Sequence, residues 1–161
     1  MASHRAIVNV SASVLPDDMK ATVGGTIVYD LNDIGNNNKW VYFSNNVSTS
    51  AQSIMADGVS FLAGDAGDET STLDADVDDL GFLVLKHSGF QGDGTTTSTD
   101  NLYLNIYHGV AASGGATDLI LEPGDVWWGR FVHSDIDDIS VDAASNTIKV
   151  LVYAILDDGG V

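Results

Sequence analysis

Apolar and polar residues alternate along most of this 161-residue chain. The clearest case is Asn101–Tyr107, in which Leu102, Leu104 and Ile106 share one face and the intervening residues share the other. A strand with one buried face shows this period of two. The pattern therefore predicts antiparallel strands at Ile7–Val14, Thr26–Leu31, Trp40–Ser44, Val59–Ala63, Asn101–Tyr107, Leu119–Glu122, Val126–Val132 and Ile139–Asp142.

Two short stretches are apolar throughout, GFLVL at Gly81–Leu85 and VLVYAIL at Val150–Leu156. They are rich in β-branched or aromatic residues, which favours strand over helix at this length. We expect both to be central strands that are covered on both faces. No window shows a helical stripe with caps at both ends, and Ser50–Asp57 is expected to form one short helical turn at most.

Turn-forming residues separate the predicted strands. Gly supplies positive φ, and Asn, Asp and Ser bond to their own backbone, so the linkers rich in these residues are turns. Pro123 and Gly124 provide the two corners of one such turn. About ten short strands with this punctuation predict an all-β fold, a two-sheet antiparallel sandwich or jelly roll with little or no helix; a single barrel is the main alternative. We expect one domain over 1–161, with short flexible arms at Met1–Arg5 and Asp157–Val161.

The charge of the chain is strongly one-sided. Six Lys and Arg stand against 23 Asp and Glu, which gives a formal net charge of −17. Nucleic-acid binding depends on Lys and Arg that release counterions, and anionic membranes attract basic segments, so we expect neither partner. Cysteine is absent, and the first ten residues, MASHRAIVNV, lack the apolar segment of a signal peptide. These features favour synthesis in a reducing cytoplasm, and no apolar run is long enough to suggest a membrane span.

No sequence motif for catalysis stands out. The four histidines show neither the H-E-x-x-H pattern nor another zinc spacing. A G-x-S-x-G nucleophile elbow is missing from the sequence. We therefore expect no enzyme activity, no catalytic residue and no cofactor.

Acidic residues gather in three places. The densest region contains alternate carboxylates at Asp74, Asp76 and Asp78, a spacing that calcium loops use. The Gly at position six and the Glu at position twelve of an EF-hand loop are missing, so that motif fails. A solvated acidic loop without metal is the favoured interpretation, and a looser calcium site at these three aspartates is the alternative. The other clusters, Ser134–Asp138 and Asp157–Asp158, show no ordered ligand pattern.

Aromatic residues provide the candidate interface. Trp127 and Trp128 are adjacent on a predicted strand, so one ring should face the core and the other should face away. Trp128 shares its face with Val126 and Arg130, and Trp127 shares the other face with Phe131. Trp, Tyr and Arg concentrate binding energy at protein interfaces. The interface candidates are Trp127, Trp128, Arg130 and, on one face of another strand, Trp40 and Tyr42.

The order of segments resembles a known group of proteins. GFLVLKHSG at Gly81–Gly89 precedes NLYLNIYHG at Asn101–Gly109, LILEPGDVWWGRF at Leu119–Phe131 and a last strand, TIKVLVYAIL, at Thr147–Leu156. This order resembles small all-β virion proteins of tailed bacteriophages, especially capsid decoration or cement proteins. In those proteins a Leu-x-Pro-Gly-Asp/Glu turn, here Leu121–Asp125, leads into an aromatic strand. The group has no shared active site, so no functional residue is carried over.

The resemblance implies a structural role. It implies an oligomer, with a trimer favoured, that is made in the host cytoplasm and sits on the capsid exterior, where it clamps neighbouring copies of the major capsid protein. The acidic composition agrees with this role, because an acidic coat protein does not compete for packaged DNA. Two alternatives stay open: a calcium-assisted carbohydrate-binding β-sandwich module, and a tail, fibre or head-completion component of the same virion.

Overall fold

The computed structural model describes residues 5–14, 21–30, 39–55, 60–62, 70–72, 78–106 and 117–158. Within these ranges the chain is almost entirely β-strand, with one short 3₁₀ helix, η1 (Ile136–Asp138). The predicted all-β class is therefore confirmed. The chain divides into two compact units, Met1–Asn38 and Lys39–Val161, which adds a division to the one domain expected over 1–161.

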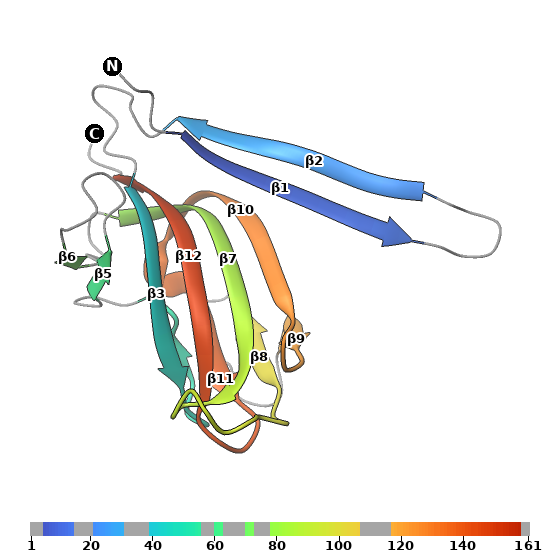
Figure 1. Ribbon diagram of the computed structural model, residues 1–161. Helices are drawn as coiled ribbons and strands as arrows, with labels where there is room; N and C mark the ends of the chain where they lie inside the picture. Colours follow the sequence, from blue (N-terminus) through green and yellow to red (C-terminus); the bar gives the residue numbers. More distant parts are fainter. Residues whose placement is uncertain are drawn as a thin grey trace. The chain divides into compact units, whose positions relative to one another are not determined.

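The first unit is a hairpin of two long strands, β1 (Arg5–Val14) and β2 (Ala21–Asp30) (Figure 1). The strands pair antiparallel over their whole length, and opposite residues share a face. One face carries Asn9 and Thr26, whose exposed side chains are joined by a hydrogen bond from Thr26 Oγ1 to Asn9 Oδ1 (2.9 Å). By register, the positions of the other face are occupied only by apolar residue types: Ala6, Val8, Val10, Ala12, Val14, Ala21, Val23, Gly25, Ile27 and Tyr29.

The second unit contains a four-stranded antiparallel sheet in the order β10-β7-β12-β3 (Figure 1). Its strands are β3 (Lys39–Val47), β7 (Asp78–Gln91), β10 (Val126–Asp135) and β12 (Ile148–Asp158). The two apolar runs lie in β7 and β12, so the prediction that they form central strands is confirmed. The prediction that both faces are covered is wrong for Val150–Leu156, because Tyr153 on the outward face of β12 is 44% exposed. It holds for Gly81–Leu85, in which no residue is exposed and the outward Phe82 is 1% exposed.

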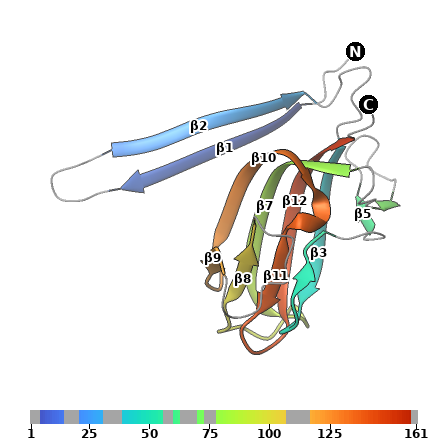
Figure 2. The ribbon, with the colours of Figure 1, turned by 180° about the vertical axis from the view of Figure 1, so that it is seen from behind.

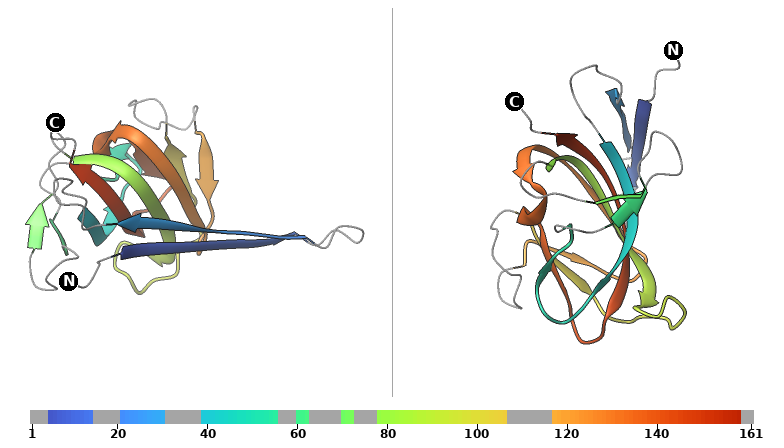
Figure 3. Two further views of the ribbon diagram at one scale, coloured as in Figure 1. Left: turned by 90° about the horizontal axis from the view of Figure 1, so that it is seen from above. Right: turned by 90° about the vertical axis from the view of Figure 1, so that its left-hand side faces the viewer.

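A second antiparallel sheet, in the order β4-β11-β8-β9, completes the sandwich (Figure 2). Its strands are β4 (Gln52–Ser53), β8 (Leu102–Asn105), β9 (Leu119–Leu121) and β11 (Ser140–Ala143). Figure 3 shows the two sheets of this unit from two further directions. A separate two-stranded sheet pairs β5 (Ser60–Leu62) with β6 (Thr70–Thr72). The two-sheet sandwich is therefore confirmed over the single barrel.

The described part of Ser50–Asp57 contains no helical turn, which agrees with the expectation of one such turn at most. It holds strand β4 because Gln52 and Ser53 pair with β11. The backbone N–H of Ile54 continues this attachment by donating to the carbonyl oxygen of Ile139 (3.0 Å). Pairing with a neighbouring strand thus decides the local structure.

The core lies between the two sheets. Inward residues of the first sheet, such as Leu85 and Val152, belong to one buried cluster with Leu102, Leu104 and Ile106 of the second. The alternation predicted for Asn101–Tyr107 is thereby confirmed over its described part. Burial of each large aliphatic side chain contributes roughly 1.5–3 kcal/mol, so this shared cluster holds the sheets together.

The Pro123–Gly124 turn joins β9 to β10, as predicted. Gly124 has a φ of 95°, which glycine adopts without strain. The turn is closed by a hydrogen bond from Asp125 N–H to the carbonyl oxygen of Glu122 (2.9 Å). It is also tied to β7, since Gly124 N–H donates to the carbonyl oxygen of His87 (3.2 Å) and His87 N–H donates to that of Asp125 (3.0 Å). These bonds fix the register in which β10 enters the sheet.

Candidate functional site

The outward face of the β10-β7-β12-β3 sheet carries three cross-strand rows of residues. Directly opposite residues of an antiparallel pair lie on the same face, so the register defines the rows. They are Arg130, Phe82, Ile155 and Trp40; Trp128, Val84, Tyr153 and Tyr42; and Val126, Lys86, Leu151 and Ser44. We call these twelve positions the aromatic face, because every strand contributes an aromatic residue to it.

Rings of the aromatic face stack across the strands. Tyr42 and Tyr153 have ring centroids 4.5 Å apart and planes inclined by 30°. Trp128 stacks with Phe82, with centroids 6.2 Å apart and planes inclined by 29°. Phe82 is only 1% exposed although it lies outside the cluster between the sheets. The face therefore has its own packed layer of rings, whose orientations are set before any partner binds.

Large apolar side chains of the aromatic face stay open to solvent. Val126 is 52% exposed and Trp128 is 41% exposed, in addition to Tyr153. Burial raises the pKa of Tyr153, and the neighbouring Tyr42 raises it further, so the Tyr153 hydroxyl is neutral at physiological pH. An exposed apolar patch on a soluble protein commonly marks an interaction site.

The charges of the aromatic face differ from those of the rest of the chain. None of the twelve positions is Asp or Glu, although the chain has 23 such residues. Lys86 and Arg130 provide two of the six Lys and Arg of the chain, and both side chains are exposed. Lys149 lies on the same side of β12, two positions before Leu151. The face is thus apolar and cationic in a protein of net charge −17.

The five predicted interface residues do not all lie on the same side of the sheet. Trp127 is half-buried against the core and meets Phe131 edge-on, with ring centroids 6.1 Å apart, whereas Trp128 faces outward. The prediction that one of the two rings faces the core and the other faces away is confirmed. Tyr42 and Arg130 lie on the aromatic face with Trp128, and the register of β3 places Trp40 there, although its side chain lies outside the described part.

Gly129 makes room for the ring of Trp127. A Cβ atom at Gly129 would lie 2.8 Å from Cη2 and 2.9 Å from Cζ2 of the indole. Any side chain at this position would push the ring from its place against the core. The glycine therefore keeps Trp127 on the inward side while Trp128 stays outward.

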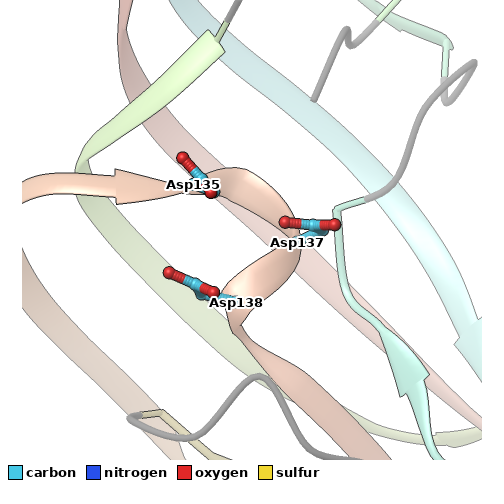
Figure 4. Close-up of side chains that lie close together, drawn as sticks. All are labelled: Asp135, Asp137 and Asp138. Atoms are coloured by element: carbon cyan, nitrogen blue, oxygen red, sulfur yellow. The ribbon is translucent and has the colours of Figure 1, made fainter. Parts of the chain in front are cut away.

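A compact group of aspartates lies where β10 leads into β11. One carboxylate oxygen from each of Asp135, Asp137 and Asp138 lies within 4.8 Å of the others around η1 (Figure 4). Partial burial raises the pKa of Asp138, and the charges of Asp135 and Asp137 raise it further. Register places Asp79 opposite Asp135 and Asp157 opposite Asp79, in the outward row next to Arg130 and Phe82. Acids therefore adjoin the aromatic face at this end of the sheet.

The predicted calcium ligands are a different set. Asp74 and Asp76 lie outside the described residues, and so does the side chain of Asp78 in β7. Sequence reasoning missed the compact group around η1 because Ser134–Asp138 has no ligand spacing as a linear motif. The 3₁₀ turn is what brings its carboxylates together. An acidic cluster of this kind is common without a metal and does not by itself define a metal site.

A buried polar network ties the loop after β7 to the turn before β12. His87 is fully buried; its Nε2 lies 2.9 Å from the carbonyl oxygen of Asp100, and its Nδ1 accepts the N–H of Gly89 (3.0 Å). Because Nδ1 accepts, the hydrogen bonds assign the neutral tautomer with the proton on Nε2. The Asp100 carboxylate accepts the Ser145 hydroxyl and both N–H groups of Asn146, and these bonds lower its pKa. The polar atoms of His87 and Asp100 are hydrogen-bonded to other groups of the protein. The network therefore holds the two loops in position.

No protein-family model and no curated protein matches this chain. Among the residues that the structure describes, no helix has the length and hydrophobicity to cross a membrane. The surfaces of the chain are therefore the grounds for assigning it a function.

Proposed function

We propose that this chain is a structural virion protein that binds the outer surface of a bacteriophage capsid and stabilises contacts between major capsid subunits. The aromatic face is the observation that carries the proposal. Binding energy at protein interfaces concentrates in Trp, Tyr and Arg, and Trp128, Tyr153 and Arg130 lie together on this face. Rings that are already stacked on a sheet lose little freedom on binding, which favours affinity.

The dimensions of the face support binding in several copies. Four strands about 4.8 Å apart and three rows about 7 Å apart outline ~400 Å², to which the buried Phe82 and Ile155 contribute almost no open surface. A standard stable interface buries ~800 Å² on each partner, so one aromatic face supplies less than half. An oligomer that presents several faces at once gains the missing affinity through avidity. We therefore propose a homo-oligomer, with a trimer favoured; the apolar positions of the hairpin are a further surface for such contacts.

The proposed protein acts by binding alone, without making or breaking a covalent bond. Its net charge of −17 keeps free copies apart in solution and opposes binding to packaged DNA. In this proposal it is made in the host cytoplasm and joins the exterior of the assembled capsid. The order of segments along the sequence, which resembles that of capsid decoration proteins, supports this location.

Addition of the purified protein to capsids that lack it tests the proposal. Capsids are prepared from the bacteriophage whose genome encodes the chain, with this gene disrupted, and bound protein is measured by co-sedimentation. We expect saturable binding with a fixed number of copies per capsid and a higher temperature of capsid rupture. Intact capsids that bind no protein at any micromolar concentration would contradict the proposal. A position on the tail or fibre in an electron-microscopy map would assign it to another part of the virion.

The exposed ring of Trp128 also favours a second candidate, a carbohydrate-binding module. Sugars stack on open aromatic rings, and Trp128 is an exposed ring on a sheet surface. Tyr42 and Tyr153 instead turn their ring faces toward each other, which leaves mainly edges for a partner. A rise in melting temperature with neutral glycans, with or without calcium, and no binding to capsids would support this candidate.

A further inference from the structure

We infer that the surface recognised by the aromatic face is an acidic protein surface, and that Lys86, in the row next to Trp128 and Tyr153, pairs with an acid of the partner. This inference rests on the proposed function and names the chemistry of the surface that the protein binds.

Lys86 lies next to the exposed rings of the aromatic face. It is placed between Val126 on β10 and Leu151 on β12, one row away from Trp128 and Tyr153. A partner that covers these two rings also covers the neighbouring row, and it removes water from the Lys86 ammonium group. Burying an unpaired charge is costly, so a tight interface needs an acid of the partner at this point.

Lys86 has no acid of its own chain among the twelve positions of the aromatic face. A cation at a protein surface commonly pairs with a nearby acid of its own chain, and this chain has 23 acids. None of them occupies the three rows, and Lys149 adds a second cation on the same side of β12. The outward row that does hold acids, Asp135, Asp79 and Asp157, adjoins Arg130 at the end of the face away from Lys86. The end of the face around Lys86 is therefore complementary to an acidic surface with apolar patches. A neutral apolar partner would gain nothing from these cations.

Long-range and short-range charges act in opposite directions here, which gives the binding a distinctive dependence on salt. At about 0.01 M salt the screening length is ~30 Å, so an acidic partner meets the full charge of −17. At about 0.15 M it is ~8 Å, and the local charges of the face dominate. At about 1 M it is ~3 Å, and the local pairs are also weakened. Affinity should therefore pass through a maximum at intermediate salt, whereas purely apolar binding should strengthen throughout.

The shape of the face favours a protein over an anionic polysaccharide. The face is a sheet surface four strands wide, and the Tyr42–Tyr153 and Phe82–Trp128 pairs use one side of each ring for stacking within the protein. A layer of ring edges and aliphatic side chains that spans four strands fits a broad protein surface. A single glycan chain would cover only part of it.

Substitution of Lys86 by residues of different charge tests the inference, with capsid binding as the measurement. Lys86→Met keeps most of the side-chain volume and removes the charge. If the partner is acidic, Lys86→Met should bind more weakly than the wild type, and Lys86→Glu more weakly by about tenfold or more. If the partner is neutral at this point, Lys86→Met should bind equally well or better, because no ammonium group has to lose its water.

A matched control separates local from global charge. Lys20→Glu makes the same change in net charge, from −17 to −19, outside the aromatic face, and should weaken binding much less than Lys86→Glu. Equal effects of the two variants would overturn the inference while leaving the proposed function intact, provided that the wild type binds.

A second assay, binding to immobilised poly-L-glutamate, tests the inference even if the wild-type protein does not bind capsids. Retention that is lost in Lys86→Glu, but kept in Lys20→Glu, would uphold the acidic recognition and reject the capsid. A wild type that binds neither matrix nor capsid would reject both. Stronger Lys86-dependent binding to a sulfated polysaccharide than to poly-L-glutamate and capsids would assign the face to glycans and overturn the inference.

Discussion

Replacement of Trp128 by alanine should weaken capsid binding about 60-fold while the sandwich stays folded. Trp128 is 41% exposed, and a tryptophan side chain offers ~250 Å², so ~100 Å² is available to a partner. At ~25 cal/mol per Å² this area is worth ~2.5 kcal/mol, which corresponds to the 60-fold change in the dissociation constant. The cost to folding is smaller, about 1 kcal/mol, because the lost contact is the stacking with Phe82.

The assay is co-sedimentation with capsids over a range of protein concentrations, together with urea unfolding of the free variant. Ile120→Ala is the matched control, since Ile120 is 55% exposed and lies on β9 of the other sheet. The control should leave capsid binding unchanged. If Trp128→Ala and Ile120→Ala bind equally well, the aromatic face is not the binding surface and the reasoning from it is refuted.

Four further predictions concern folding. Gly129→Ala should destabilise the protein by about 1–3 kcal/mol and shift tryptophan fluorescence, because its Cβ would displace Trp127; an unchanged melting curve would contradict this. Asp100→Asn should lower the urea midpoint at pH 7. The difference should begin to shrink near the ordinary aspartate pKa of 3.8 and vanish only as the pH falls through the lowered folded-state pKa of Asp100, because the stabilisation is lost between these two values. Asp138→Asn should raise stability at pH 7 and lose that gain in acid, because the pKa of Asp138 is raised by the fold; a midpoint below that of the wild type at pH 7 would argue against it. Removal of residues 1–38 should leave the melting temperature of the sandwich unchanged, because every core residue that the structure describes lies in the second unit; a broadened or lost transition would show that the hairpin is needed for folding.

Local patterns in the sequence were sufficient for the fold class and for most strands. Alternation around Leu102 and Leu104 identified β8 and its buried face, because successive side chains of a strand point to opposite faces and the apolar ones face the core. Pro123 and Gly124 identified the turn before β10 for the same local reason. The adjacency of Trp127 and Trp128 was enough to predict that one ring is inward, though the sequence did not say which.

The aromatic face as a whole could not be predicted in this way. Gly81–Leu85 is apolar on both sides of the strand, so the sequence does not distinguish the inward Leu83 from the outward Phe82. The rows also depend on which strands are neighbours, and the order β10-β7-β12-β3 joins segments far apart in the chain. The aspartates around η1 were missed because a 3₁₀ turn and cross-strand pairing, rather than spacing along the chain, bring them together.

An electron-microscopy reconstruction of capsids saturated with the protein shows directly which surface of the protein is bound. We expect ordered density for the sandwich on the capsid exterior, with the outward side of β10, β7, β12 and β3 against acidic parts of the major capsid subunits. Sandwich density in which this sheet face points to solvent, or capsids that carry no added density at all, would contradict it.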